Sequence, residues 1–246
     1  MRTVQMRSKN LILSTALAWL LTAIVFGTVP FVQAQTFTVL YSFTGGADGG
    51  DPLAGLVVDS EGNLYGTTSG GGAGLLGCVF GCGVVFKVDP SGNETVLHNF
   101  GEVLTDGAGP AYGSLLRDGA GDLYGTTSVG GTEGSGTIFR LSATGKETVV
   151  SFKGGADGGF PDAGIILGTG GTAYGTTYYR GTGCPPYGCG TVYKVNASGK
   201  ITLLHSFTNG ADGAYPLAGL VQDSAGNLYG TTLNGGTFGI RGRVQD

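Results

Sequence analysis

Short runs of β-branched and aromatic residues, each bounded by Gly, Asp, Asn or Pro, follow one another along most of the chain, and this pattern predicts short β-strands. The first group predicts four strands, at 55–59, 63–68, 83–89 and 94–100. Asp59-Ser-Glu-Gly-Asn63 joins the first pair and Asp89-Pro-Ser-Gly-Asn93 joins the second. Both segments are typical of a type I turn followed by a Gly in the left-handed conformation. Such tight turns make the joined strands antiparallel neighbours.

This four-strand group recurs along the sequence. The motif Tyr-Gly-Thr-Thr occurs four times, beginning at Tyr65, Tyr124, Tyr174 and Tyr229. A second marker, a Phe preceded by Ser or Asn, keeps the same period at Phe43, Phe100, Phe152 and Phe207. Four-stranded meanders repeated in this way are typical of β-propeller blades, whereas β-solenoid coils have shorter periods and few hairpins. A pair of β-sandwiches is the remaining alternative.

The predicted fold class is therefore all-β, a β-propeller of about four four-stranded blades. Its repeats lie at about 55–100, 114–152, 164–207 and 219–246. Residues 36–43 match a fourth strand that has no first three strands before it, and the last repeat stops after a predicted third strand at 239–245. The N-terminal strand can complete the last blade, which would remove two open sheet edges. We therefore expect one repeat domain over 35–246.

Residues 1–34 have the pattern of a secretory signal peptide. Arg2, Arg7 and Lys9 precede an apolar run over 11–29, and Val32-Gln-Ala34 provides a cleavage site. An uncleaved membrane anchor is the alternative, because about 19 apolar residues just reach spanning length. In either reading the remainder of the chain faces the outside of the cell. The predicted location is secreted or on the bacterial cell surface.

Composition excludes several classes of protein. Gly accounts for 51 of 246 residues, which excludes a helical bundle because each interior Gly costs a helix about 1 kcal/mol. The chain has 13 basic and 17 acidic residues, and its net charge of −4 argues against nucleic acid as a partner. Hydrophobic residues make up 41% and charged residues 12%, so the chain is too apolar for a disordered tail.

Three sequence motifs recur in the same order, and together they resemble the motifs of a known family. In the first repeat they are Leu40-Tyr-Ser-Phe-Thr-Gly-Gly-Ala-Asp-Gly49, Asp59-Ser-Glu-Gly-Asn-Leu-Tyr-Gly-Thr-Thr68 and Gly83-Val-Val-Phe-Lys-Val-Asp-Pro-Ser-Gly92. Over nearly all of 36–239 the chain is similar to the GloVer-type extracellular tandem-repeat family, also called choice-of-anchor repeat proteins. The resemblance implies a secreted bacterial repeat protein, often longer than this chain and ending in a cell-surface sorting segment, without an assigned activity.

The end of the chain departs from the family pattern. Gly242 stands where the earlier repeats have Phe86, Phe139 and Tyr193, and no anchor segment follows. A truncated fragment of a longer repeat protein is therefore a further alternative.

The long and varied connections lie on one side of the predicted propeller, where a binding surface is expected. The connection into each repeat carries an Asp-Gly, which makes four carboxylates candidate metal ligands: Asp48, Asp106, Asp157 and Asp212. A hard cation such as calcium takes several oxygen ligands. The simpler interpretation is that each Asp caps its own turn, and it is favoured because no Asp-x-Asp-x-Asp-Gly loop occurs. No other cofactor is expected.

The cysteines predict disulfides, because four cysteines in an exported chain are expected to be oxidised. The preferred pairs are local, Cys78 with Cys82 and Cys184 with Cys189, since the two repeats lie opposite each other in a ring of four. A zinc site formed by all four thiolates is the alternative.

Two sets of repeated side chains are interpreted as packing. His98 and His205 share a strand position with Tyr41 and Val150, which indicates a packing position rather than a Ser-His-Asp centre. The repeated strand aromatics, such as Tyr65 and Phe86, are expected to form interblade core. The glycines that follow the repeated Tyr are expected to let neighbouring sheets approach closely.

The predicted function is a secreted or cell-surface, non-enzymatic repeat protein with a binding or scaffold role through its loop-rich face. The expected partner is an extracellular protein or a glycan, and membrane contact is expected only through an uncleaved signal. The alternative is a propeller hydrolase or lyase acting on sugars or lactones with acidic residues near the axis.

Overall fold

The computed structural model describes residues 37–73, 78–103, 105–110, 112–236 and 243–244. The chain divides into two units, Met1–Val39 and Leu40–Asp246. The predicted secretory signal lies outside the described residues. In the described part of the chain, no helix has the length and apolar character needed to cross a membrane.

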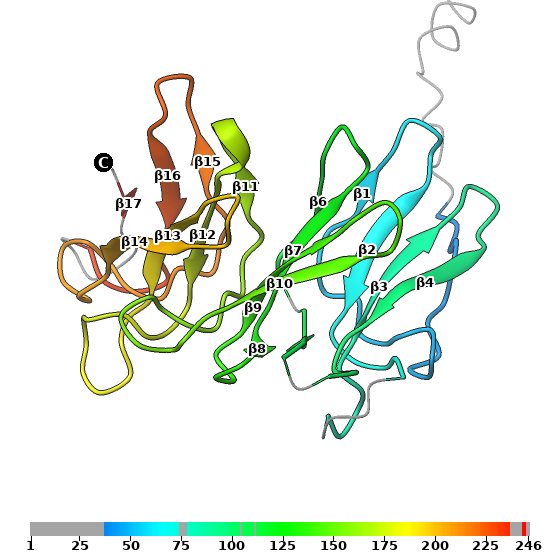
Figure 1. Cartoon of the computed structure of the whole chain (residues 1–246), viewed down its shortest axis with the longest axis horizontal. Helices are drawn as coiled ribbons and strands as arrows, with labels where there is room; N and C mark the ends of the chain where they lie inside the picture. The colour runs from blue at the N-terminus through cyan, green and yellow to red at the C-terminus, as the bar shows by residue number, and fades with distance from the viewer. Residues whose placement is uncertain (1–36, 74–77, 104, 111, 237–242, 245–246) are drawn as a thin grey trace, which may run out of the picture. The chain divides into compact units, whose positions relative to one another are not determined.

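The second unit is all-β and consists of antiparallel sheets (Figure 1). The first sheet has the order β1 (Val57–Val58), β2 (Leu64–Thr68), β3 (Val84–Val88), β4 (Glu94–Asn99). The second has the order β6 (Leu116–Arg117), β7 (Leu123–Thr127), β9 (Thr137–Leu141), β10 (Glu147–Ser151). The strands of the first sheet lie within the four predicted ranges.

The third sheet has the order β11 (Ile166–Leu167), β12 (Ala173–Thr177), β13 (Thr191–Val195), β14 (Ile201–Ser206). The fourth contains β15 (Val221–Gln222), β16 (Leu228–Thr231) and β17 (Arg243–Val244). Two further elements lie in connections, the two-stranded sheet of β5 (Gly107–Ala108) with β8 (Val129–Gly130) and the 3₁₀ turn η1 (Thr169–Gly171).

Within three of the sheets, a glycine pairs with an aromatic residue on the next strand. The pairs are Gly66 with Phe86, Gly125 with Phe139, and Gly175 with Tyr193. A Cβ at any of these glycines would fall less than 3.0 Å from the paired aromatic side chain. The glycine therefore makes room for a ring that lies across its own sheet. This role differs from the predicted one, in which these glycines bring neighbouring sheets together.

Buried aromatic rings join consecutive sheets in edge-to-face pairs. Phe100, directly after β4, packs against Phe139 of β9 with ring centroids 5.1 Å apart, and Phe152, directly after β10, packs against Tyr193 of β13 at 5.0 Å. All four side chains are fully buried. Such pairs contribute about 0.5–1.5 kcal/mol beyond the burial of their area. The repeated strand aromatics therefore form a core between sheets as well as within them.

The predicted closure by the N-terminal strand is not found in the described residues. Residues 37–43 are not in a strand, and the fourth sheet consists of β15, β16 and β17. Of the predicted third strand at 239–245, the structure describes residues 243–244, which form β17. Phe43 instead packs against Phe86 of β3, with ring centroids 4.7 Å apart. Phe43 therefore packs against the first sheet without strand pairing.

One side chain at the start of most of the tight hairpin turns holds the turn together. Asp59 Oδ1 accepts hydrogen bonds from the backbone N–H groups of Glu61 and Asn63 at 3.0 and 2.9 Å. Its Oδ2 accepts from the side-chain amide of Asn63 and the hydroxyl of Tyr65, both at 2.9 Å. Gly62 has φ +84°, as the turn sequence predicts. The side-chain hydrogen bond from Asn63 is the main reason that the pKa of Asp59 falls to about 2.

The same turn recurs with small changes. Asp89, Asp118 and Asp223 accept equivalent backbone hydrogen bonds, and Asn196 does so in the third sheet. Because an uncharged side chain supports one of these turns, hydrogen-bond acceptance is the feature that they share. The first turn of the third sheet has Gly168 at this position, and the Gly168 N–H donates to the Thr172 carbonyl at 2.8 Å.

We expect the turn to make stability depend on acid. Since the pKa of Asp59 is depressed from 3.8 to about 2 by folding, its contribution is present above pH 3.8 and is lost as the pH falls through about 2. D59N keeps an acceptor, as Asn196 does, and removes the charge. Urea unfolding followed by circular dichroism should show D59N less stable than the wild type near neutral pH, with the difference shrinking toward pH 2. E61Q, which removes a charge two residues away, should show no such convergence. A difference for D59N that stays constant with pH would contradict this account.

We also expect one tyrosine hydroxyl to reduce stability. The Tyr193 hydroxyl is buried and has no hydrogen-bond partner among the described residues, and burial raises the pKa of Tyr193. Phe86 and Phe139 occupy the same position in the first two sheets. Y193F should therefore stabilise the protein by about 1 kcal/mol in chemical unfolding, because an unpaired buried hydroxyl is removed. The reverse change, F139Y, should destabilise. A loss of stability in Y193F would contradict the prediction.

Candidate functional site

In each repeat, the connection that enters a sheet pairs with the loop between the second and third strands of that sheet. In the second sheet this pairing forms β5 and β8. In the other sheets it is a single bridge: Gly50 with Gly70, Gly159 with Tyr179, and Ala214 with Asn234. These segments, called the paired loops below, carry the predicted aspartates and both cysteine pairs.

The predicted aspartates lie in four separate turns. Each accepts a hydrogen bond from a backbone N–H four or five residues earlier: Asp48 from Thr44 at 2.8 Å, Asp106 from Gly101 at 2.9 Å, Asp157 from Lys153 at 3.1 Å and Asp212 from Thr208 at 2.9 Å. In the described part of the chain, the group of His, Cys, Asp and Glu side chains close enough to share a metal ion contains only one of these four, Asp106.

The glycine after each Asp is pressed against the sheet that follows. A Cβ on this glycine would fall less than 3.0 Å from the hydroxyl oxygen of the last Thr of Tyr-Gly-Thr-Thr, in the pairs Gly49–Thr68, Gly107–Thr127, Gly158–Thr177 and Gly213–Thr232. Thr68 is buried, and its hydroxyl donates to the carbonyl of Gly70 at 2.9 Å. The Asp is thus fixed to the end of one repeat and the Gly to the start of the next.

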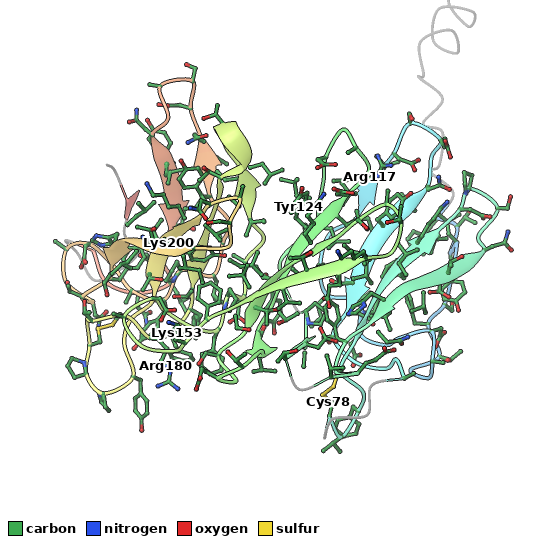
Figure 2. The ribbon with its side chains drawn as sticks, viewed as in Figure 1. Cys78, Arg117, Tyr124, Lys153, Arg180 and Lys200 are labelled. Atoms are coloured by element: carbon green, nitrogen blue, oxygen red, sulfur yellow. A yellow bond between two sulfur atoms is a disulfide. The ribbon has the colours of Figure 1, made fainter. Side chains whose placement is uncertain are left out.

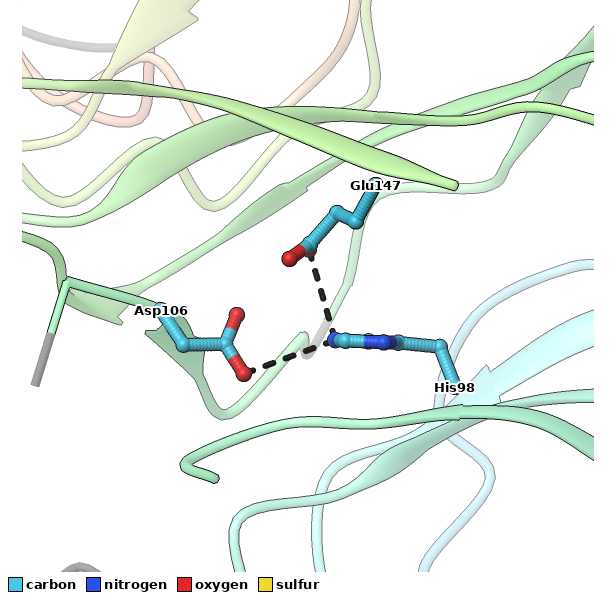
Figure 3. A group of neighbouring side chains, drawn as sticks. All are labelled: His98, Asp106 and Glu147. Atoms are coloured by element: carbon cyan, nitrogen blue, oxygen red, sulfur yellow. Dashed lines mark ion pairs between the residues drawn. The ribbon is translucent and has the colours of Figure 1, made fainter. Parts of the chain in front are cut away.

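Asp106 belongs to a polar cluster of three side chains, shown in Figure 3. His98 comes from β4, Asp106 from the connection between the first two sheets, and Glu147 from the start of β10. His98 Nε2 lies 3.4 Å from Asp106 Oδ2 and 3.3 Å from Glu147 Oε1. The side chains are 17%, 2% and 17% exposed in the same order. We refer to these three residues as the junction cluster.

The junction cluster leaves two buried atoms without hydrogen bonds. Among the described residues, neither His98 Nε2 nor Glu147 Oε1 has a hydrogen-bond partner. Asp106 is better satisfied, because its two oxygens accept from the backbone N–H groups of Gly101 and Gly107 at 2.9 and 2.7 Å. These backbone bonds fix the direction of the Asp106 carboxylate.

Burial and charge shift the pKa values in the junction cluster. Burial lowers the pKa of His98, but contact with Asp106 and the charge of Glu147 outweigh it, so that this pKa is raised above 6.5. Burial raises the pKa of Glu147 to about 7, with Asp106 adding to the effect and His98 opposing it. The cluster sets two carboxylates against one imidazole, and it therefore favours bound protons or another cation.

Two other junctions hold related side chains, and in the first of them Glu94 Oε1 is also buried without a hydrogen-bond partner among the described residues. Before the first sheet the corresponding residues are Tyr41, Asp48 and Glu94, and the Tyr41 hydroxyl donates to Asp48 at 3.0 Å. Burial and then the charge of Asp48 raise the pKa of Glu94. After the third sheet, His205 Nε2 makes a 3.2 Å hydrogen bond with Asp212.

The junction between the second and third sheets is apolar at the same positions. Val150 replaces His98 and Ile201 replaces Glu147, and both pack against one hydrophobic cluster. The two polar residues are thus absent together. Sequence reasoning treated His98 as a packing residue and missed Glu147; the signal was this joint change at the middle and the start of the fourth strand.

The paired loops of the third sheet carry a group of aromatic side chains. Tyr179 packs near Phe160 and Tyr215, with ring centroids 5.8 Å apart in both cases, and the Arg180 guanidinium lies 5.8 Å from the Phe160 centroid. Figure 2 labels Arg180. A pocket of about 330 Å³ is lined by Phe160, Tyr179, Arg180 and Tyr187, here called the aromatic pocket. Tyr187 is 70% exposed.

The backbone that presents the aromatic pocket is constrained. Phe160 and Arg180 have φ of 59° and 68°, a left-handed conformation that costs a bulky residue about 1–3 kcal/mol. The Cys184–Cys189 disulfide closes the loop, and the Arg180 N–H donates to the Tyr187 carbonyl at 2.9 Å. The left-handed conformation recurs at the equivalent positions of other repeats, at Asp51 and Tyr215 for Phe160 and at Gly71 and Gly235 for Arg180. It is therefore a feature of the repeat, and in the third sheet it positions two of the side chains that line the pocket.

The first sheet has a second disulfide loop. Cys78 and Cys82 are bonded (Figure 2), as are Cys184 and Cys189. Between Cys78 and Cys82, the side chains of Val79 and Phe80 are 88% and 85% exposed. Both disulfides therefore support loops with exposed apolar residues, and neither pair of cysteines is left to bind zinc.

Sequence comparison identifies a family. A family model described as the Gloeobacter/Verrucomicrobia repeat matches residues 77–245. No curated protein matches the chain.

Among solved structures, the chain is similar to virginiamycin B lyase from Staphylococcus aureus, with 14% identity and a TM-score of 0.47 over 80% of this chain and 56% of the other. It is also similar to a gluconolactonase from Xanthomonas campestris, with 14% identity and a TM-score of 0.44 over 78% and 56%. A luciferin-regenerating enzyme matches with 15% identity and a TM-score of 0.40 over 75% and 70%. The chain thus spans little more than half the length of the first two.

The contact between Asp-Gly and Thr can be tested with two glycines of similar φ. Gly158 has φ +92° and a crowded Cβ position, whereas Gly145 has φ +82° and nothing within 4 Å of that position. We expect G145A to cost about 1 kcal/mol from its backbone conformation alone. G158A should cost about 1–3 kcal/mol more, because the methyl group collides with Thr177 and Thr191. Urea unfolding measures both changes, and equal losses would contradict the proposed contact.

Proposed function

This chain belongs to the Gloeobacter/Verrucomicrobia repeat family, and we propose that it is a non-enzymatic extracellular repeat protein that binds a glycan through the aromatic pocket of its third repeat. The observation that carries the proposal is the aromatic pocket itself, three aromatic side chains and one Arg around about 330 Å³. This volume lies within the usual range of small-molecule sites.

The pocket has chemistry suited to a sugar. Phe160 and Tyr179 offer apolar ring faces, while the Tyr179 and Tyr187 hydroxyls and the Arg180 guanidinium offer polar groups beside them. One sugar ring presents both C–H faces and hydroxyls, so it can use both kinds of contact at once. Tyr and Arg are also enriched in protein interfaces, but a closed disulfide loop with a small pocket favours a small unit such as a sugar ring.

An extracellular location is supported by the disulfides. Two bonded cysteine pairs are typical of proteins that fold in an oxidising compartment. The predicted signal peptide and the family membership agree with export to the outside or to the cell surface.

The proposed fold is a β-propeller of about four blades. The common strand order of the first three sheets and the aromatic pairs between consecutive sheets support it. Close backbone approach between Gly113 and Gly164 supports neighbouring first strands around an axis. The Phe43–Phe86 pair repeats the contact of Phe100 with Phe139, which supports a place for residues 40–43 beside the first blade, where a completing fourth strand would lie.

The enzymatic alternative, a sugar or lactone hydrolase or lyase, relies on aspartates that converge near the axis. Their hydrogen bonds within separate turns favour a structural role for them. This favours the binding role over the enzymatic one.

Binding can be tested with the full chain and a panel of soluble bacterial and plant polysaccharides, by affinity electrophoresis and by tyrosine fluorescence. We expect at least one polysaccharide to bind, and Y179A/Y187A to weaken that binding at least about tenfold, because two of the four lining side chains are removed. Y112A is the matched control, since Tyr112 is 60% exposed and lies outside the pocket. Binding that survives Y179A/Y187A would contradict the assigned pocket, and no binding to any polysaccharide would contradict the glycan.

A further inference from the structure

The junction cluster contains buried polar atoms that lack hydrogen-bond partners among the described residues. It places two carboxylates and an imidazole nitrogen together away from water, and two of the three facing atoms make no hydrogen bond within the described chain. Buried polar atoms of this kind normally have partners. At the junction before the first sheet, Glu94 Oε1 likewise has no hydrogen-bond partner among the described residues, but the Tyr41 hydroxyl there donates to Asp48 in place of a second unpartnered atom. At the other two junctions His205 bonds to Asp212 and Val150 is apolar.

The distances fit a metal ion. Two ligand atoms that each lie about 2.0–2.1 Å from a tetrahedral centre are about 3.3–3.4 Å apart. His98 Nε2 lies 3.4 Å from Asp106 Oδ2 and 3.3 Å from Glu147 Oε1, and the three ligand atoms all lie within 4.8 Å of one another. The two separations from His98 Nε2 therefore match those between ligands of one small ion, and the third separation, between the carboxylate oxygens, is no more than 4.8 Å.

The ligand set favours zinc over calcium. One imidazole nitrogen with two carboxylates suits zinc, which accepts both kinds of ligand and needs only four. Calcium takes six to eight oxygen ligands at longer distances and seldom a nitrogen. The backbone N–H groups of Gly101 and Gly107 hold the Asp106 carboxylate, which is the kind of support that orients metal ligands.

The geometry points to a zinc site formed by His98, Asp106 and Glu147 that joins the first two sheets. His98 comes from the last strand of one sheet, Glu147 from the last strand of the next, and Asp106 from the connection between them. A bound ion ties all three segments together, so its binding energy adds to the stability of the junction.

The chain provides its own apolar replacement for the site. H98V/E147I introduces the residues of the next junction, Val150 and Ile201, which pack against a hydrophobic cluster there. The double variant removes two ligands and leaves no buried charge from them, so it is expected to fold. H205V is the matched control, since it removes a His–Asp pair that no third carboxylate completes among the described residues.

The experiment is a zinc titration of the full chain after metal removal by chelation, with a chromophoric chelator as competitor and thermal unfolding in parallel. We expect one zinc ion per chain and a higher Tm with zinc. H98V/E147I should weaken zinc binding at least about 100-fold and lose the Tm shift, and H205V should keep both. E147Q, which keeps the size of the side chain, should weaken binding about tenfold or more, and it provides the test should H98V/E147I not fold.

If zinc binds, three results would still overturn the site. They are zinc binding of equal strength in the wild type and H98V/E147I or E147Q, an equal loss of binding in H205V, and a calcium-induced Tm shift as large as that with zinc. The first two would place the ion elsewhere, and the third would indicate nonspecific binding to acidic residues. Absence of any zinc binding by the wild type would overturn the proposal directly.

Discussion

The contact between the Asp-Gly glycine and the last Thr of Tyr-Gly-Thr-Thr is the constraint on which the repeat depends. The glycine has no room for a Cβ because the Thr hydroxyl and methyl occupy that space. The Thr is held in turn by its hydrogen bond to a loop carbonyl, as Thr68 is by Gly70. One residue earlier, the Asp is bonded to the end of the preceding repeat. Two adjacent residues thus fix the position where one repeat meets the next, and the aromatic pairs between sheets form around that fixed point.

Most of the fold could be predicted because its signals are local. Turn motifs such as Asp59-Ser-Glu-Gly-Asn63 specify a hairpin by their own hydrogen bonds. The two strands joined by such a turn must then pair in antiparallel orientation. The role of Gly66 could not be predicted, because it depends on the cross-strand register that places the Phe86 ring over it. The absence of strand pairing at residues 37–43 in the described chain has a similar cause. Strand pairing needs a partner backbone, and side-chain similarity at 36–43 gives no information about that partner.

The candidate sites were less accessible to sequence reasoning. The four aspartates were noticed because they repeat, yet repetition reflects their shared structural task in a turn. The junction cluster escaped notice because only one of its three members repeats at every junction. Glu147 acquires its importance from His98, which lies 49 positions earlier in the sequence, and the two change together only when junctions are compared. The aromatic pocket, in contrast, lies in a single repeat, where departure from the common pattern is the signal.

In each Asp-Gly dipeptide the Asp bonds to the preceding turn and the Gly contacts the Thr of the following sheet. These separate roles determine where repeats can be exchanged between proteins of this kind. An exchange at a strand boundary would part an Asp from the turn that it caps, or a Gly from the Thr that it touches. An exchange at the peptide bond between Asp106 and Gly107 keeps the Asp106 carboxylate with the N–H of Gly101 and keeps Gly107 with Thr127. The natural module for recombination or for engineering longer chains therefore begins at a glycine and ends at an aspartate. Its boundaries lie within the connections between sheets and do not coincide with the ends of the strands.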